Sequence, residues 1–230
     1  MSSSHSYSAA ILVTASAALL LSATYVAMVE VGPFATERLS ERATVRAVAD
    51  GIVAPGLSIQ SQIDFLFHCR VAMTSLAGRA QPSAVREKIL GTCGEGSDAI
   101  VAAAPGFSAA WYTGALVASF TGEPEKMNRW LDQSYATGPF EQWIAELRVD
   151  LVEDNFADLD AGLLDRHLAD LAILLSNDRG RRFLASRYLA FPPLRERIDL
   201  LLTTASEPDA RRFLNIVERL RVEKERTHGR

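Results

Sequence analysis

The stretch APGFSAAWYTGALVASFTGEPEKMNRWLDQSYATGPFEQW, residues 104–143, decides the fold of this chain. Pro105 and Pro139 bracket two helix-length segments, and Gly122 lies between these segments. Glycine permits a tight reversal of the backbone, and proline ends a helix because it has no N–H to donate. We therefore expect two antiparallel helices that reverse at Gly122 and stop at Pro139, with Trp111 filling the gap between them.

The spacing of this stretch resembles one unit of the tetratricopeptide repeat family. Its two prolines lie 34 positions apart (105 to 139), which is the period of that repeat. The pattern departs from the family in its second helix, where Met127 and Ser134 stand at positions that favour small residues. An isolated unit cannot bury its faces, so the resemblance implies a short right-handed stack of helices with a groove. The residues that carry this repeat are Pro105, Trp111, Gly122 and Pro139.

The chain on both sides of this stretch also shows helical periodicity and no convincing strand alternation. Between residues 57 and 224, apolar residues recur on single helix faces, with Gly, Pro, Asn or Asp between the segments. A segment near 58–79 carries Ile63, Phe67 and Val71 on one face, and a later segment carries Leu164, Leu168, Leu171 and Leu175. The sequence therefore predicts an all-α domain over residues 57–224, followed by a flexible tail over 225–230.

An uncharged apolar segment, Ala9–Val29, precedes this domain and follows a short tail over residues 1–8. Its 21 residues would form a helix of about 31 Å, which matches the hydrocarbon core of a bilayer. A cleavable signal peptide is the alternative, and cleavage near Ser22–Thr24 stays open. The segment has no cationic residues before it and is longer than a usual signal core. We therefore expect a single uncleaved transmembrane helix over residues 9–29.

Residues 30–56 are expected to form a stalk and a linker. Acidic and basic residues recur at four-residue spacing over residues 35–50, which predicts a solvated helix and allows a homodimer contact through the stalk. The residues in this pattern are Glu37, Arg38, Glu41, Arg42 and Arg46. The sequence GIVAPG, residues 51–56, then breaks the helix.

The two cysteines, Cys69 and Cys93, are too few for a zinc site, and two interpretations stay open for them. They are either two reduced, buried thiols or one disulfide, which would require an oxidising compartment. If their helices are antiparallel around a turn near residue 81, each cysteine lies 12 residues from that turn (81 − 69 and 93 − 81). The two side chains can then face each other across the pair of helices.

A second resemblance covers more of the chain. The anchor, the two cysteines and the patterns around Trp111 and Arg148 are similar to small envelope proteins of alphaproteobacteria, some of which accompany exopolysaccharide machinery. That resemblance implies a periplasmic domain on the bacterial inner membrane, although Phe140 replaces the expected Asn. The residues that carry it are Cys69, Cys93, Ala104, Pro105, Ser108, Ala110, Trp111, Ser134, Tyr135, Thr137, Gly138, Pro139, Glu141, Trp143 and Arg148. Against it, the arginines that follow the apolar segment favour a cytoplasmic domain by the positive-inside rule.

Residue patterns that carry chemistry are few in this sequence. A net charge of −4 does not favour binding to nucleic acid. The sequence contains no phosphate loop, nucleophile elbow or zinc-protease motif. The acidic run over residues 153–160 lacks the glycine and final glutamate of a calcium loop, and we interpret it as a helix junction capped by Asp158. A basic cluster is a candidate partner surface, and its members are Arg179, Arg181, Arg182 and Arg187.

These patterns predict a membrane-anchored protein-interaction module, with no enzymatic activity and no cofactor, that serves envelope or exopolysaccharide assembly. Its expected partners are the membrane, through one span, and other proteins of that machinery. Two alternatives stay open: an adaptor that faces the cytoplasm, and a thiol-handling accessory such as those of cytochrome maturation.

Overall fold

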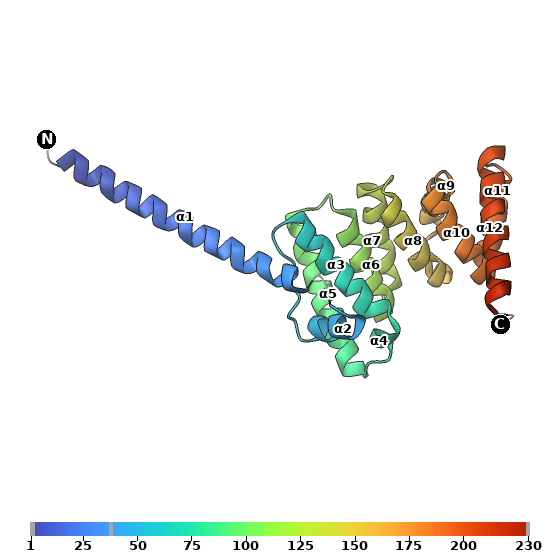
Figure 1. Ribbon diagram of the computed structural model, residues 1–230, viewed down its shortest axis with the longest axis horizontal. Coiled ribbons are helices and arrows are strands. Elements are labelled where there is room, and N and C mark those ends of the chain that lie inside the picture. The colour runs from blue at the N-terminus through green and yellow to red at the C-terminus, as the bar shows by residue number, and fades with distance from the viewer. Residues whose placement is uncertain (1–2, 37–38, 229–230) are drawn as a thin grey trace. The chain divides into compact units, whose positions relative to one another are not determined.

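The computed structural model describes the backbone of residues 3–36 and 39–228 and the side chains of residues 12–30 and 39–227. Every regular element in these ranges is a helix (Figure 1), which confirms the predicted all-α fold with an N-terminal apolar helix. The α-helices are α1 (Ser3–Thr36), α2 (Glu41–Ala49), α3 (Ile59–Thr74), α4 (Leu76–Arg79), α5 (Ser83–Ala103), α6 (Ser108–Thr121), α7 (Pro124–Thr137), α8 (Gln142–Asp154), α9 (Leu164–Leu175), α10 (Asp178–Ala190), α11 (Pro192–Leu202) and α12 (Glu207–His228). Two short 3₁₀ turns, η1 (Phe156–Asp158) and η2 (Ala161–Leu163), lie between α8 and α9.

The chain divides into two compact units, residues 1–100 (unit 1) and 101–230 (unit 2). The boundary falls near the end of α5. Helix α2 is therefore grouped with α3, α4 and α5, although the sequence suggested that the folded domain begins at residue 57.

Helix α1 contains the predicted apolar segment and extends beyond it. Its 34 residues correspond to about 51 Å at 1.5 Å per residue. Its window Leu12–Glu30 is apolar and long enough to cross a membrane, the one such window in the described residues, and none of it is buried. This length and composition are typical of a membrane anchor or a signal sequence.

The predicted stalk over residues 35–50 is not one solvated helix. Helix α1 ends at Thr36, and α2 begins after Ser40, whose hydroxyl accepts a hydrogen bond from the Ala43 N–H at 3.4 Å. One face of α2 is buried against α3 and α4, with Val45 and Val48 at its centre. The charged spacing of this segment therefore marks the outer face of a packed amphipathic helix. Residues 37 and 38 lie outside the described residues, and the homodimer contact stays a prediction.

Unit 1 is centred on α3 and α5, which a disulfide between Cys69 and Cys93 joins with a Cα–Cα distance of 5.6 Å. The predicted bridge is thereby confirmed. The buried face of α3 carries Phe65, Leu66 and Met73, whereas Phe67 of the predicted stripe is 53% exposed. That choice of face was wrong, because a helix with apolar residues on several sides does not reveal which side is covered.

Helix α5 runs without interruption through Gly91, Gly94 and Gly96. At Gly96 an added Cβ would overlap the ring of Phe65 from α3. The glycine therefore allows the two helices to approach closely, and it does not break the helix.

In unit 2, α6 and α7 form the predicted helical hairpin. Gly122 ends α6 in a left-handed conformation with a φ of 72°, and Pro124 occupies the first turn of α7. Helix α7 ends at Thr137, two residues before Pro139. The local predictions for Gly122 and Pro139 are therefore confirmed, while the wider tetratricopeptide repeat stays a prediction.

Helices α8 to α12 share an apolar core in unit 2. The core includes Val149 of α8, Leu171 and Leu174 of α9, Leu184 of α10 and Phe213 of α12, all with no exposed surface. The last two leucines of the predicted α9 stripe are buried, whereas Leu164 at its start is 38% exposed.

Candidate functional site

The most distinctive cavity of unit 2, here called the tryptophan pocket, has a volume of about 560 Å³. It lies between the outer face of α7 and the loop that carries η2. The residues that line it are Trp111, Asn128, Arg129, Trp130, Asp132, Gln133, Asp160, Gly162 and Leu163.

The two indole rings of the pocket hold each other in place. Trp111 and Trp130 meet edge to face, with 4.9 Å between ring centroids, a favoured geometry for aromatic pairs. The indole N–H of Trp111 donates to the Pro105 carbonyl at 2.7 Å. Trp130 lies over Gly114 of α6, where any Cβ would overlap its ring. Trp130 therefore takes the place between the helices that the sequence assigned to Trp111, and Trp111 is only partly buried.

Asn128 fixes the opposite wall of the pocket. Its side-chain amide donates to the Pro124 carbonyl at 3.0 Å and to the Asp158 carbonyl at 2.7 Å, and its oxygen accepts the Asp160 N–H at 3.0 Å. The loop after α8 is therefore attached to α7. Asp158 takes part through its backbone, and the residue at the N-cap of α9 is Leu163. The predicted cap by Asp158 is therefore wrong.

Several polar groups remain available at the mouth of the pocket. Arg129 and Gln133 are exposed on adjacent turns of α7, and neither side chain makes an ion pair or hydrogen bond with the described residues. Asp132, in contrast, pairs with Arg166 at 3.2 Å. The pocket thus presents hydrogen-bond donors beside aromatic surface. Such a combination suits a segment with an acceptor group and an apolar side chain.

A buried arginine behind the pocket sets the position of α7 against α8 and α9. Arg148 has no exposed surface, and its guanidinium donates to both carboxylate oxygens of Asp170 at 2.7 Å. It also donates to the carbonyls of Ser134 at 3.0 Å and Gly138 at 3.1 Å, and it lies 4.4 Å from the Tyr135 ring centroid. Arg148 therefore adds a charged donor to two carbonyls at the end of α7, which also accept the backbone N–H groups of Gly138 and Glu141.

A second buried network joins α8, α9 and α11. The carboxylate of Glu153 accepts hydrogen bonds from Nε2 of His167 at 2.8 Å and from Arg197. Burial tends to raise the pKa of Glu153, but the hydrogen bonds from His167 and Arg197 outweigh it and hold that pKa below its ordinary value. Arg197 also lies 3.7 Å from the Phe156 ring centroid. These contacts tie the acidic run after α8 to the rest of unit 2.

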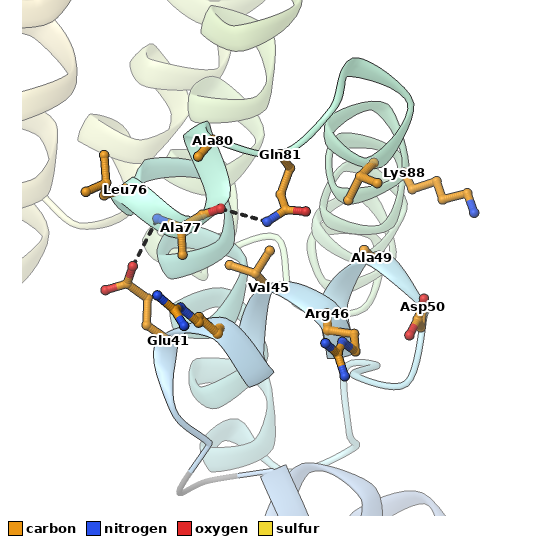
Figure 2. Close-up of a pocket in the computed structure, with 12 residues that line it drawn as sticks. Glu41, Val45, Arg46, Ala49, Asp50, Leu76, Ala77, Ala80, Gln81 and Lys88 are labelled. Atoms are coloured by element: carbon orange, nitrogen blue, oxygen red, sulfur yellow. Dashed lines mark hydrogen bonds between the residues drawn. The ribbon is translucent and has the colours of Figure 1, made fainter.

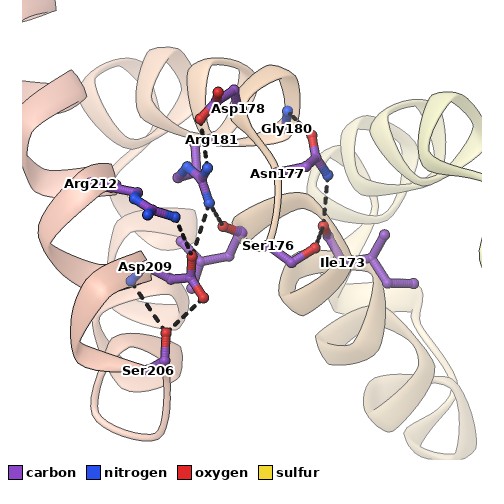
Figure 3. Close-up of polar contacts among 10 residues, drawn as sticks. Ile173, Ser176, Asn177, Asp178, Gly180, Arg181, Ser206, Asp209 and Arg212 are labelled. Carbon is purple, nitrogen blue, oxygen red and sulfur yellow. Dashed lines mark hydrogen bonds and ion pairs between the residues drawn. The ribbon is translucent and has the colours of Figure 1, made fainter.

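The predicted arginine surface does not form one patch. Arg181 is buried and donates to the Leu175 carbonyl at 2.8 Å, to Asp209 at 3.1 Å and to Asp178 at 2.6 Å (Figure 3). Arg182 is exposed and makes no ion pair within the described residues.

The other two arginines of that group pair with α8. Arg179 forms an ion pair with Glu146 at 2.9 Å, and Arg187 forms one with Asp150 at 2.6 Å. The guanidinium groups of this cluster are therefore largely committed to contacts inside unit 2.

Unit 1 has a pocket of its own, of about 660 Å³, between α2, α4 and α5. Figure 2 shows Arg46 and Lys88 among the side chains that line it, with Val45 between α2 and α4. Glu41 at its edge accepts the Ala77 N–H at 3.1 Å. The lining combines cationic and acidic side chains with apolar ones, so it does not single out one class of ligand.

The other groups that could carry chemistry are the two cysteines and the histidine and acidic side chains. Both cysteines of the disulfide are fully buried, and thiol exchange requires access to a sulfur atom. Within the described residues, no group of three or more His, Cys, Asp or Glu side chains could hold a metal ion.

Comparison of the chain with protein-family models, with characterised proteins and with solved structures finds no match. The two resemblances noted in the sequence are therefore carried by residue patterns alone.

Residue patterns alone would not have located the tryptophan pocket. Gly114 and Trp130 lie 16 positions apart on different helices (130 − 114), so no single-helix periodicity links them. The sequence signal that could have indicated this contact is a helix rich in glycine and alanine that is followed by a helix with a tryptophan.

Proposed function

We propose that this protein is a membrane-anchored binding module whose folded part lies outside the cytoplasm and holds a partner protein of envelope or exopolysaccharide assembly. The tryptophan pocket is the observation that carries the binding role. Trp and Arg are the residues most enriched at the centres of protein interfaces, because they bury a large area and form directional hydrogen bonds.

The position of Arg129 and Gln133 defines the partner segment. Both side chains present donors at the pocket mouth, so the segment that binds carries a carboxylate or a backbone carbonyl there. An apolar side chain of the same segment packs against the indoles of Trp111 and Trp130. The walls are pre-organised by Gly114, Asn128 and Arg148, which reduces the ordering cost of binding.

The disulfide supports an extracytoplasmic location. Cytoplasmic thiols are kept reduced, whereas bridges such as Cys69–Cys93 persist in oxidising compartments. The apolar helix α1 supplies the attachment to the membrane. Arg42 and Arg46, which follow α1, favour the alternative of an adaptor that faces the cytoplasm.

Reporter fusions distinguish the two topologies. With alkaline phosphatase fused to the C-terminus we expect activity, and with green fluorescent protein in the same place we expect no fluorescence. The opposite pattern would move the folded part to the cytoplasm and overturn the proposed location.

Site-specific photo-cross-linking in the native host tests the pocket. A photoreactive residue in place of Gln133 should give a discrete adduct, and the same residue at Asn215 of α12, which is also exposed, should give none. Arg129→Glu should abolish the Gln133 adduct while leaving the protein folded, because the Arg129 side chain is exposed and makes no ion pair or hydrogen bond within the part of the chain that the structure describes. Adducts of equal yield at both positions would show that the pocket is not the binding site.

A further inference from the structure

The end of the apolar window is joined to the start of α3 by a cluster of hydrogen bonds around Glu30. Its carboxylate accepts the backbone N–H groups of Leu57 at 2.6 Å and Ser58 at 2.7 Å, and the Ser58 hydroxyl at 2.8 Å. The hydroxyl of Ser61 donates to the same carboxylate. Glu30 therefore binds the free N–H groups that precede α3, a favourable place for a negative charge.

The segment that Glu30 binds is unusual in composition and exposure. Residues 51–63 contain no charged side chain, in a chain that is 23% charged. Three of its large apolar side chains are exposed: Ile52 by 63%, Leu57 by 56% and Ile59 by 69%. Leu57 and Ile59 are two positions apart in the chain, and large apolar side chains such as these are less favourable in water than in an apolar environment.

The depth of this segment in the membrane follows from the length of the apolar helix and from the hydrogen bonds to Glu30. The 19-residue window Leu12–Glu30 gives a helix of about 28 Å, close to the thickness of the hydrocarbon core, which places Glu30 at one interface. Leu57 and Ser58 are hydrogen-bonded to Glu30 and so lie at the same depth. Ile59 follows Ser58 directly, and one residue spans at most about 3.8 Å.

We propose that the segment around residues 57–59 rests on the lipid bilayer, with Leu57 and Ile59 inserted at the boundary between headgroups and acyl chains. The inference rests on the membrane anchoring of the proposed function and adds a second membrane contact to it. The hydrogen bonds of Glu30 hold the start of α3 at the bilayer surface. Unit 1 is then held in one orientation at the membrane and does not swing on a free stalk.

Depth-dependent quenching tests the proposal on the full-length protein in vesicles of phosphatidylethanolamine and phosphatidylglycerol. A fluorophore is attached in turn to Leu21→Cys in α1, Ile59→Cys and Leu76→Cys; the native cysteines are bridged and buried, so they do not react. Leu76 is 83% exposed in the same unit but lies beside charged Glu41 and Arg79, which makes it a matched control. The quencher for Ile59 and Leu76 is a lipid with a nitroxide near its glycerol backbone, and the quencher for Leu21 is a lipid with the nitroxide near the end of an acyl chain.

We expect several-fold stronger quenching at Ile59 than at Leu76, and loss of that difference when Glu30→Ala is added. Quenching at Leu21 should persist in both backgrounds. Strong quenching at Leu21 with equal, weak quenching at Ile59 and Leu76 would overturn the inference and leave the anchoring intact. Absence of quenching at Leu21 would show that the anchoring itself is wrong, and the inference would fall with it.

Discussion

Unit 1 and unit 2 are stabilised by different means. The packed helices of unit 1, α2 to α5, span only about 60 residues, a size at which a folded chain buries about 60% of its surface. A buried disulfide supplements this small core. Unit 2 is larger and has a continuous apolar core, and it contains the buried ion pairs of Arg148 with Asp170 and of Glu153 with Arg197. A small core thus relies on a covalent link, while a larger core accommodates charges that fix its geometry.

The largest expected effect comes from Arg148→Met, which should lower the stability of unit 2 by about 3–5 kcal/mol. The change leaves Asp170 buried without its partner and removes one of the hydrogen-bond donors to the carbonyls of Ser134 and Gly138. Hydrogen exchange of the full-length chain in detergent reads the stability of each unit separately. The matched control is Arg148→Met with Asp170→Leu, which removes both charges and should recover most of the loss. Equal destabilisation by both variants would mean that the pair itself is unimportant.

The same variant should respond to pH. Burial raises the pKa of Asp170 above its ordinary value, and the hydrogen bonds from Arg148 oppose that rise. Without Arg148, nothing from that side chain lowers the pKa of Asp170, so this pKa rises further. A folded state that binds a proton more tightly than the unfolded state gains stability as the pH falls. The deficit of Arg148→Met relative to the wild type should therefore shrink as the pH is lowered toward the ordinary pKa of an aspartate, and a constant deficit would contradict this.

The second effect concerns the bridge in unit 1. Replacing both Cys69 and Cys93 by Ala should lower the stability of unit 1 by about 3 kcal/mol, because the loop of 24 residues is no longer closed in the unfolded chain. Hydrogen exchange should rise in α3 and α5 and stay unchanged in α8 to α10. Wild-type protein that is reduced while unfolded and then refolded in reductant should reproduce the change, and the same treatment should have no effect on the variant. Equal loss in both units would remove the contrast between them.

A third effect compares two glycines of α5. Gly96→Ala should cost about 1–3 kcal/mol, because the new methyl group overlaps the Phe65 ring. Gly91→Ala meets no atom within 4 Å and should stabilise the helix by about 0.5–1 kcal/mol. Thermal unfolding of the two variants should therefore shift in opposite directions. Shifts in the same direction would show that α3 and α5 are not in close contact at Gly96.

The smallest effect is expected at the surface of unit 2. Arg179→Ala removes an ion pair whose arginine is largely exposed and should cost about 0.2–1 kcal/mol, less in high salt. A loss of several kcal/mol, measured by urea unfolding at low and high salt, would mean that ion pairs stabilise unit 2 at its surface as well as in its core.

The sequence predicted most of the local structure and little of the site. The apolar helix, the turn at Gly122 and the bridge between Cys69 and Cys93 each follow from residues whose backbone or covalent chemistry allows few alternatives. The tryptophan pocket depends on how Trp130 packs over Gly114, a contact between helices.

The buried charges were missed for a related reason. Arg148 and Asp170 look like ordinary surface residues of amphipathic helices, because only the covering helices make them interior. Likewise, the charged spacing around Arg42 predicted a free stalk, whereas Val45 and Val48 on the other face bury α2 against α3 and α4.

The position of Arg148 also sets an order of assembly during synthesis. Its partners come from both directions along the chain: the carbonyls of Ser134 and Gly138 are made before it, and Asp170 is made 22 residues after it. A nascent chain that ends between α8 and α9 would have to bury a cation with no counter-ion, so we expect α8 to pack stably against the α6–α7 hairpin only after α9 is made. The junction of α7, α8 and α9 can then form once Asp170 has left the ribosome, before the rest of the core is supplied by α10 to α12.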